Sequence, residues 1–156
     1  MTFDDLNLNT PLRTALTELG LTTPTTIQHR VFPIVMSGRD VCGIAQTGTG
    51  KTAAFGLPLL QLIDGSQRHP QALIVCPTRE LCLQITNDLE TYKKHSKNIY
   101  TEAVYGGASI MMQIRNLKRG VHIVVATPGR LIDLIERKAI DLQKVKYVVL
   151  DEADEM

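Results

Sequence analysis

Short apolar runs recur along the chain and are separated by polar segments. Most of these runs are nearly continuous rather than alternating, a pattern typical of β-strands that are covered on both faces. The pattern predicts five strands, over Asp40–Ala45, Ala72–Cys76, Ile99–Val104, His122–Ala126 and Lys146–Leu150.

Segments with helical spacing lie between the predicted strands, over Lys51–Ile63, Arg79–Lys93, Ser109–Lys118 and Leu131–Lys138. Two further helices are expected before the first strand. One begins at Thr10-Pro11, which serve as its cap and first turn, and the other runs from Thr25 to Met36 and is broken or kinked at Pro33. Because strands that alternate with helices need crossover connections, an α/β fold with a parallel sheet is predicted.

Composition narrows the class of protein. The 156 residues suit one domain. The 17 basic and 16 acidic side chains give a net charge of +1, which excludes binding of nucleic acid by bulk charge but leaves a local basic surface open. No apolar run approaches a membrane span, so we expect no membrane association. The three cysteines form no C-x-x-C pair, which indicates neither a zinc site nor a disulfide framework and favours a reducing, cytoplasmic compartment.

A conspicuous polar segment follows each predicted strand. The segments are AQTGTGKT (45–52), PTRE (77–80), YGG (105–107), TPGR (127–130) and DEAD (151–154). Since ligands bind outside the carboxyl ends of the strands in open parallel sheets, these five segments are predicted to meet at one functional edge.

The first segment has the form of a phosphate-binding loop. Gly48 and Gly50 allow backbone N–H groups to approach phosphate oxygens, Lys51 adds a positive charge, and the Thr52 hydroxyl can bind Mg²⁺. Ala45 stands where the strict pattern requires its first glycine. The alternative interpretation is a strand-to-helix turn without a ligand.

Two acidic residues, Asp151 and Glu152, follow the last predicted strand. Alone they would be interpreted as a solvated strand end. Beside a phosphate loop, one carboxylate can hold Mg²⁺ and the other can orient or deprotonate the attacking water.

Two residues near the amino terminus are candidates for contact with a base. The amide of Gln28 matches the N7 acceptor and N6 donor of adenine, and Phe3 could stack on the ring. Taken alone, Gln28 is better interpreted as a polar helix residue and Phe3 as a terminal side chain that fills the core; their contact with a base depends on the other motifs.

Together these segments resemble the first RecA-like domain of a DEAD-box RNA helicase, and the resemblance covers essentially the whole chain. Phe3 with residues 20–28 resembles the Q motif, and the later motifs follow in the family's order: I (45–52), Ia (77–81), the glycine pair (106–107), Ib (127–130) and II (151–154). Ala45 is usual in this family, whereas Cys82 stands where alanine is common.

The resemblance implies a three-layer RecA-like P-loop NTPase domain with a central parallel sheet. Residues 1–36 would form the Q-motif region and residues 37–156 an incomplete helicase ATP-binding domain. It also implies that ATP and Mg²⁺ are cofactors, with RNA held through its backbone.

The implied roles divide into four sets. Adenine and phosphates would be bound by Phe3, Gln28, Ala45, Gln46, Thr47, Gly48, Thr49, Gly50, Lys51 and Thr52. Lys51, Asp151 and Glu152 would be catalytic, and Thr52 and Asp151 would hold Mg²⁺. The RNA backbone would be bound by Thr78, Arg79, Gly106, Gly107, Thr127, Pro128, Gly129 and Arg130.

The sequence contains no Ser-Ala-Thr element and no second RecA-like domain, which in the family completes the ATP site and the RNA cleft. We therefore expect this chain alone to bind adenine nucleotide weakly, to hydrolyse it poorly and to unwind nothing. The family's strand before Ser-Ala-Thr separates the phosphate-loop strand from the DEAD strand, so its absence predicts a gap in the sheet. The alternatives are a catalytically silent nucleotide- or RNA-binding scaffold and a DNA helicase of the same superfamily.

Overall fold

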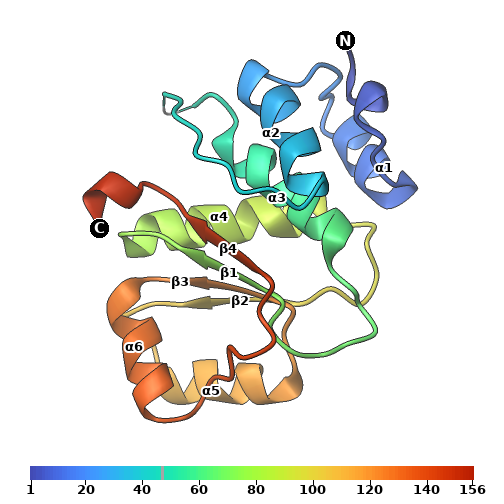
Figure 1. The fold of residues 1–156 in the computed structure, drawn as a ribbon. Helices are drawn as coiled ribbons and strands as arrows, with labels where there is room; N and C mark the ends of the chain where they lie inside the picture. Colours follow the sequence, from blue (N-terminus) through green and yellow to red (C-terminus); the bar gives the residue numbers. More distant parts are fainter. Residues whose placement is uncertain (47) are drawn as a thin grey trace. The chain divides into compact units, whose positions relative to one another are not determined.

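The computed structural model describes residues 1–46 and 48–156 (Figure 1). They form two compact units, one of Met1–Leu62 with Asp88–Lys97 and one of Ile63–Asn87 with Asn98–Met156. None of the helices in the described part of the chain has the length and apolarity of a membrane span.

The first unit is helical. Its described residues form a 3-10 turn, η1 (Phe3–Leu6), the helices α1 (Thr10–Glu18), α2 (Thr26–Met36) and α3 (Lys51–Leu62), and the end of α4 (Arg79–Tyr92) from Asp88. The cap of α1 was predicted at Thr10, but the side chain of Asn9 caps it by accepting from the Leu12 N–H at 3.1 Å. The prediction is wrong by one residue because Asn is also a strong N-cap and stands immediately before the Thr-Pro pair.

Helix α2 continues through Pro33, where the sequence predicted a break or kink. The carbonyl of Pro33 accepts a hydrogen bond from the Ser37 N–H at 3.1 Å, so a further turn forms after the proline. The loss of one N–H donor inside the helix is offset by the burial of Val31 and Phe32 and by the capping box at Thr25.

The segment Asp40–Ala45, predicted as the first strand, is not a strand in the structure. Residues 41–44 are exposed, and the Ile44 side chain retains 95% of its accessible surface. A strand exists only where a neighbour offers a hydrogen-bond ladder, and no described strand pairs with this segment. An apolar run indicates a segment that tends to be extended and buried, but it does not show which strand, if any, it would pair with.

The other four predicted strands are confirmed, and all lie in the second unit. They are β1 (Ala72–Val75), β2 (Thr101–Val104), β3 (Ile123–Ala126) and β4 (Tyr147–Leu150). All pairs are parallel, in the order β2-β3-β1-β4. The central strands β1 and β3 are buried along their whole length, as their continuous apolar sequences predict.

The register aligns the carboxyl ends of all four strands. Val75 of β1 lies opposite both Ala126 of β3 and Leu150 of β4, and Val104 of β2 lies opposite Ala126. The segments that follow these strands therefore leave from one edge of the sheet.

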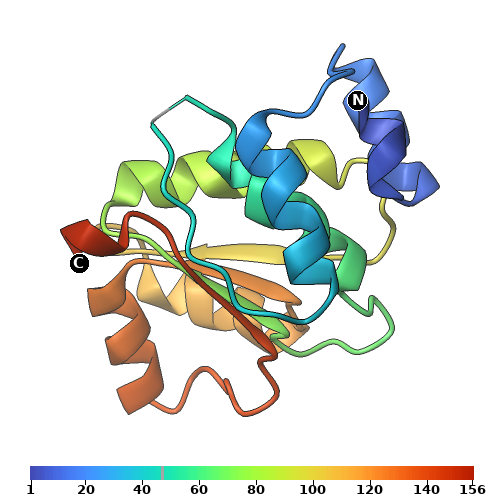
Figure 2. The same cartoon turned by 45° about the horizontal axis from the view of Figure 1, so that its top comes forward.

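Helices cover both faces of this sheet (Figures 1 and 2). Helices α5 (Ile110–Arg119) and α6 (Pro128–Glu136) lie on one face, over a buried cluster of Leu73, Val75, Val104, Val124, Ala126, Leu131 and Leu134. The first half of α4 (Arg79–Tyr92) lies on the other face, where the Cys82 thiol is 3.2 Å from the carbonyl oxygen of Val125. The predicted three-layer α/β fold with a central parallel sheet is confirmed.

The core between the sheet and α6 gives a direct stability test. Leu134 is fully buried, with 0% of its surface accessible, and we expect Leu134→Ala to lower the free energy of unfolding by about 3 kcal/mol. Ile132 lies on the same helix with 54% of its surface accessible, and Ile132→Ala should cost less than about 0.5 kcal/mol. Urea denaturation of the two variants measures the difference, and equal losses would contradict this packing.

A second test uses β2, one of the two edge strands of this sheet. Burial raises the pKa of the Glu102 carboxyl above its ordinary value of 4.5, against a hydrogen bond from Asn116 that lowers it. The folded protein therefore keeps this proton to a higher pH than the unfolded chain does. Stability should fall as the pH rises from about 4.5 to the raised pKa.

Glu102→Gln cannot ionise, so it should lack this fall and be more stable than the wild type at neutral pH. Urea midpoints of both proteins between acidic and neutral pH measure the difference. Two parallel curves would show that Glu102 does not titrate differently in the folded state.

Candidate functional site

The predicted phosphate loop lies in the first unit and leads into α3. Gly48 and Gly50 have φ angles of +84° and +81°, a backbone region that favours glycine. The Thr49 hydroxyl donates to the carbonyl of Gln46, and α3 begins at Lys51. The loop thus has the glycine conformations and the helix N-terminus of an anion-binding turn. Thr47 lies outside the described residues.

The side chain of Gln28 connects the Q-motif region to this loop. Its Oε1 accepts from the Thr25 N–H at 3.0 Å, which caps α2, and its Nε2 donates to the Gly50 carbonyl at 3.1 Å. Gln28 is 8% exposed, so both bonds are made away from bulk water. The structure therefore brings two of the segments predicted to bind nucleotide into direct contact.

Phe3 is buried within the first unit, and its N–H donates to the Thr22 carbonyl at 3.0 Å. This burial is what the core interpretation predicted. Stacking of Phe3 on adenine stays a prediction. Ala45 is half-buried and Gln46 is exposed before the loop.

The two carboxylates lie in the second unit, at the end of β4. The Asp151 N–H donates to the Val75 carbonyl at 2.9 Å, which extends the ladder between β4 and β1 by one bond. Oδ1 of Asp151 accepts from the Glu152 N–H at 3.1 Å, and Glu152 has a φ of +51°. The turn therefore begins at Asp151 and leaves both residues half-buried at the strand end.

Lys51 and Thr52 belong to the first unit, whereas Asp151 and Glu152 belong to the second. A shared ATP and Mg²⁺ site made of all four residues stays a prediction.

The residues predicted to bind RNA lie in the second unit, in the segments after β1, β2 and β3. Most are exposed, namely Thr78, Arg79, Gly106, Gly107 and Gly129, while Thr127, Pro128 and Arg130 are half-buried. The Thr78 hydroxyl accepts from the Leu81 N–H at 3.2 Å and so caps α4. Thr127 is the N-cap of α6 without a side-chain cap bond.

Contacts join these three segments to one another. The Arg79 guanidinium lies 5.1 Å from the centroid of the Tyr105 ring, at the start of the glycine pair. Arg130 donates from Nη1 to the Ala108 carbonyl at 3.1 Å and to Oε1 of Gln113 at 2.9 Å. The convergence predicted from strand order is confirmed for these segments and for the DEAD segment after β4, by the register above.

Sequence reasoning missed two members of this group. Tyr105 was noted only as part of YGG, although an aromatic side chain beside an exposed glycine pair could have been singled out. Gln113 carries no sequence signal, because it stands within a helix and no motif marks it.

Two cysteines flank the Pro77–Leu81 segment. Cys76 and Cys82 are free and buried, and a hydrogen bond between the thiols lowers the pKa of Cys76 and raises that of Cys82, which burial raises further. Their burial makes them packing residues beneath the exposed Thr78 and Arg79.

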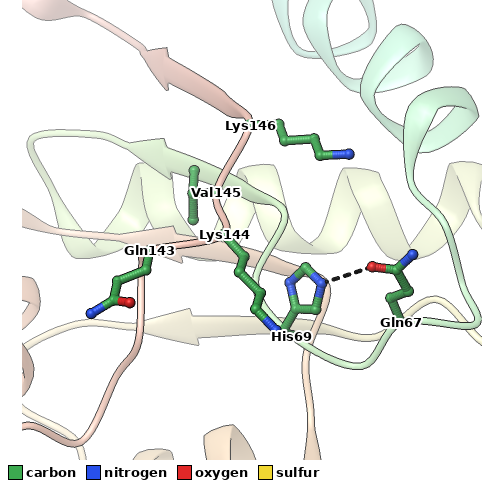
Figure 3. A pocket seen from close by; sticks show the side chains of 6 residues that line it. All are labelled: Gln67, His69, Gln143, Lys144, Val145 and Lys146. Carbon is green, nitrogen blue, oxygen red and sulfur yellow. Dashed lines mark hydrogen bonds between the residues drawn. The ribbon is translucent and has the colours of Figure 1, made fainter.

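Two hollows adjoin the second unit's sheet. One, of about 270 Å³, lies at the amino ends of β1 and β4 and is lined by Gln67, His69, Gln143, Lys144, Val145 and Lys146 (Figure 3). It is at the edge opposite the motifs, and its His69 ring is held by Gln67 at 3.2 Å. The other, of about 260 Å³, lies beside Tyr105, Ala108 and Gln113.

The Gln28 contact makes Gly50 a sharp test of the loop. A Cβ on Gly50 would meet Nε2 of Gln28, and its φ of +81° is strained for an L side chain. We expect Gly50→Ala to lower the free energy of unfolding by at least about 1 kcal/mol. Gly129 has open space and ordinary φ, so Gly129→Ala should cause no loss. Thermal denaturation of both variants measures this, and an unaffected Gly50→Ala protein would contradict the contact.

Comparison with known proteins agrees with these motifs. Residues 25–156 match the family model of the DEAD/DEAH box helicases. An ATP-dependent RNA helicase DeaD from Klebsiella pneumoniae is 50% identical over 155 residues, 99% of this chain and 24% of that protein. A DEAD-box ATP-dependent RNA helicase CshA from Streptococcus pneumoniae is 49% identical over 156 residues, 100% of this chain and 30% of that protein.

A solved structure gives the same result for the fold. The crystal structure of a DEAD box protein from Methanococcus jannaschii matches with a TM-score of 0.94 and 41% identity, covering 100% of this chain and 42% of that one. The chain thus spans about a quarter of the length of the DeaD relative. Since the family model covers most of the chain, and does so from the Q-motif glutamine to the DEAD carboxylates, the protein belongs to the DEAD/DEAH box helicase family.

Proposed function

We propose that this chain supplies the Mg-ATP-binding and RNA-backbone-binding half of a cytoplasmic ATP-dependent RNA helicase. The observation that carries the proposal is the register of the parallel sheet, which sends the PTRE, YGG, TPGR and DEAD segments from one edge. That edge brings together the segments proposed to bind the RNA backbone and the two carboxylates proposed to act on ATP.

For the nucleotide, Lys51 and the amides of the loop bind the β- and γ-phosphates, and Gln28 recognises adenine. Gln28 uses two of its four hydrogen-bonding positions on Thr25 and Gly50, so one donor and one acceptor position remain for the N7 and N6 edge of the base. Phe3 stacks on the ring once nucleotide is bound.

The donor set fits Mg²⁺. The Thr52 hydroxyl and the Asp151 carboxylate are hard oxygen ligands, and Mg²⁺ in phosphate sites takes one or two such protein ligands and keeps several waters. The bound ion supplies positive charge to the phosphate oxygens. Glu152, adjacent to Asp151, orients or deprotonates the attacking water.

For RNA, the exposed segments offer hydroxyls, glycine amides, a helix N-terminus and two arginines. These groups bind phosphates and sugars without contacting base edges, so they bind RNA of any sequence. A grip of this kind needs only a local basic surface, which is compatible with the net charge of +1. Hydrolysis and unwinding require a second RecA-like domain.

The test is ATP turnover with and without single-stranded RNA, on this chain and on a version extended by a second RecA-like domain. We expect RNA-stimulated turnover from the extended protein only, with little from the chain alone. Lys51→Ala should reduce the stimulated rate at least about 100-fold, because it removes a phosphate-binding charge. Lys144→Ala, an exposed lysine at the opposite edge of the sheet, is the matched control.

Three results would overturn parts of this proposal. An extended protein that binds ATP but never hydrolyses it would favour the scaffold alternative. Stimulation by DNA in preference to RNA would favour a DNA helicase. RNA unwinding by the chain alone would show that the second domain is dispensable.

A further inference from the structure

Gln113 is a buried amide that the motifs do not account for. It lies in α5, most of whose polar side chains are accessible, yet only 4% of its surface is exposed. A buried amide is costly unless it is hydrogen-bonded, so the identity of its partners shows what it holds in place.

Both ends of the Gln113 side chain bind groups of the candidate RNA face. Its Nε2 donates to the Tyr105 carbonyl at 3.2 Å, and its Oε1 accepts from Nη1 of Arg130 at 2.9 Å. The same Nη1 donates to the Ala108 carbonyl at 3.1 Å. Tyr105 and Ala108 bracket Gly106 and Gly107, so Gln113 and Arg130 together hold both ends of the glycine pair.

The third segment joins through Tyr105 and Gly107. Arg79 lies over the Tyr105 ring at 5.1 Å, and a Cβ on Gly107 would stand 3.1 Å from Nη1 of Arg79. Gly107 has a φ of +88°, which the loop adopts without strain only as glycine. A shift of the Tyr105 backbone would therefore also move the ring and the glycine against which Arg79 packs.

We propose that Gln113 is a positioning residue for RNA binding: it orients Arg130 and fixes the glycine loop without touching RNA. The inference rests on the proposed function, since it concerns the same RNA face. Two protein acceptors occupy Nη1 of Arg130, and among the described residues no protein acceptor binds its Nε or Nη2. Those two nitrogens are the ones left to contact a phosphate, and Gln113 sets the direction in which they point.

Positioning matters here because a long arginine side chain loses rotamer freedom when it binds a phosphate. An arginine already held at Nη1 has lost part of that freedom before RNA arrives, so less is lost on binding. Removal of Gln113 should therefore weaken RNA binding although no RNA contact is deleted.

The experiment compares Gln113→Leu with Gln71→Leu as a matched control. Gln71 is also a buried glutamine, 5% exposed, and it holds a loop through Asp64 and Gln67, but it lies at the amino end of β1, on the edge opposite the motifs. Both variants lose buried hydrogen bonds, so both should be less stable. Only Gln113→Leu should bind RNA more weakly.

Binding of a fluorescein-labelled oligouridine is measured by anisotropy over a series of salt concentrations, on this chain and on the extended protein, at a temperature at which circular dichroism shows every variant folded. We expect the affinity of Gln113→Leu to fall about 10-fold, and that of Gln71→Leu to change less than about 2-fold. If Arg130 loses its phosphate contact, the slope of log affinity against log salt becomes shallower by about 0.7.

A conservative variant separates the two ends of the side chain. Gln113→Glu keeps an acceptor for Arg130 but loses the donor to the Tyr105 carbonyl. It should retain the wild-type salt slope while losing part of the affinity. Wild-type affinity and slope in Gln113→Leu, or an equal loss in Gln71→Leu, would overturn the proposal.

A second measurement tests whether Gln113 holds Arg130 without using RNA. Failure of the wild type to bind RNA would refute the proposed function, but it would leave this measurement valid. NMR of the arginine side chains should show slowly exchanging Nη protons for Arg130 in the wild type and in Gln113→Glu, and their loss in Gln113→Leu. Arg130 signals that are the same in all three proteins would show that Gln113 does not hold this guanidinium.

Discussion

The parallel hydrogen-bond ladder among β1, β3 and β4 is the constraint on which the second unit depends. A slip of one residue would turn every side chain of a strand to the other face of the sheet, so that Leu73 and Val75 would leave the cluster beneath α5 and α6. With Val75 opposite both Ala126 and Leu150, the residues that follow are placed at one edge. Asp151 continues the ladder through its N–H, so backbone geometry places the first carboxylate, whose Oδ1 also accepts from the Glu152 N–H.

The sequence predicted these strands because β1 and β3 are buried at every position, and burial on both faces requires an apolar residue at each one. A strand covered on both faces must be apolar throughout, and Ala72–Val75 and Ile123–Ala126 meet that demand. The same rule failed at Asp40–Ala45, where the run is apolar but no described strand pairs with it. Strand pairing is a property of two segments distant in sequence, so a single run cannot predict it. Helix α1 shows a smaller failure, since two good capping residues stood side by side and Asn9 prevailed.

Some residues of the candidate site could likewise be predicted from the sequence, and others could not. The exposed Arg79 and the half-buried Arg130 were predictable because polar side chains in the segments that follow strands have few structural reasons to be there. Gln113 was not predictable, because its partners lie 8 and 17 residues away and its burial exists only after folding. The motif letters thus identify groups that can meet a ligand, while the residues that hold those groups must be found in the structure.

Each unit holds its glycine loop by the same physical means. Gly50 and the Gly106–Gly107 pair offer no side chains with which to fix their own position, and backbone carbonyls beside them must find donors. In the first unit Nε2 of Gln28 donates to the Gly50 carbonyl, which also accepts from the Ala54 N–H, and in the second Nε2 of Gln113 donates to the Tyr105 carbonyl. The oxygen of the Gln28 amide accepts from the Thr25 N–H at the start of its own helix, and that of Gln113 accepts from Arg130 of another segment; both bonds limit rotation of the amide. A glutamine of this kind thus joins a glycine loop to its own helix, with both ends of its side chain hydrogen-bonded.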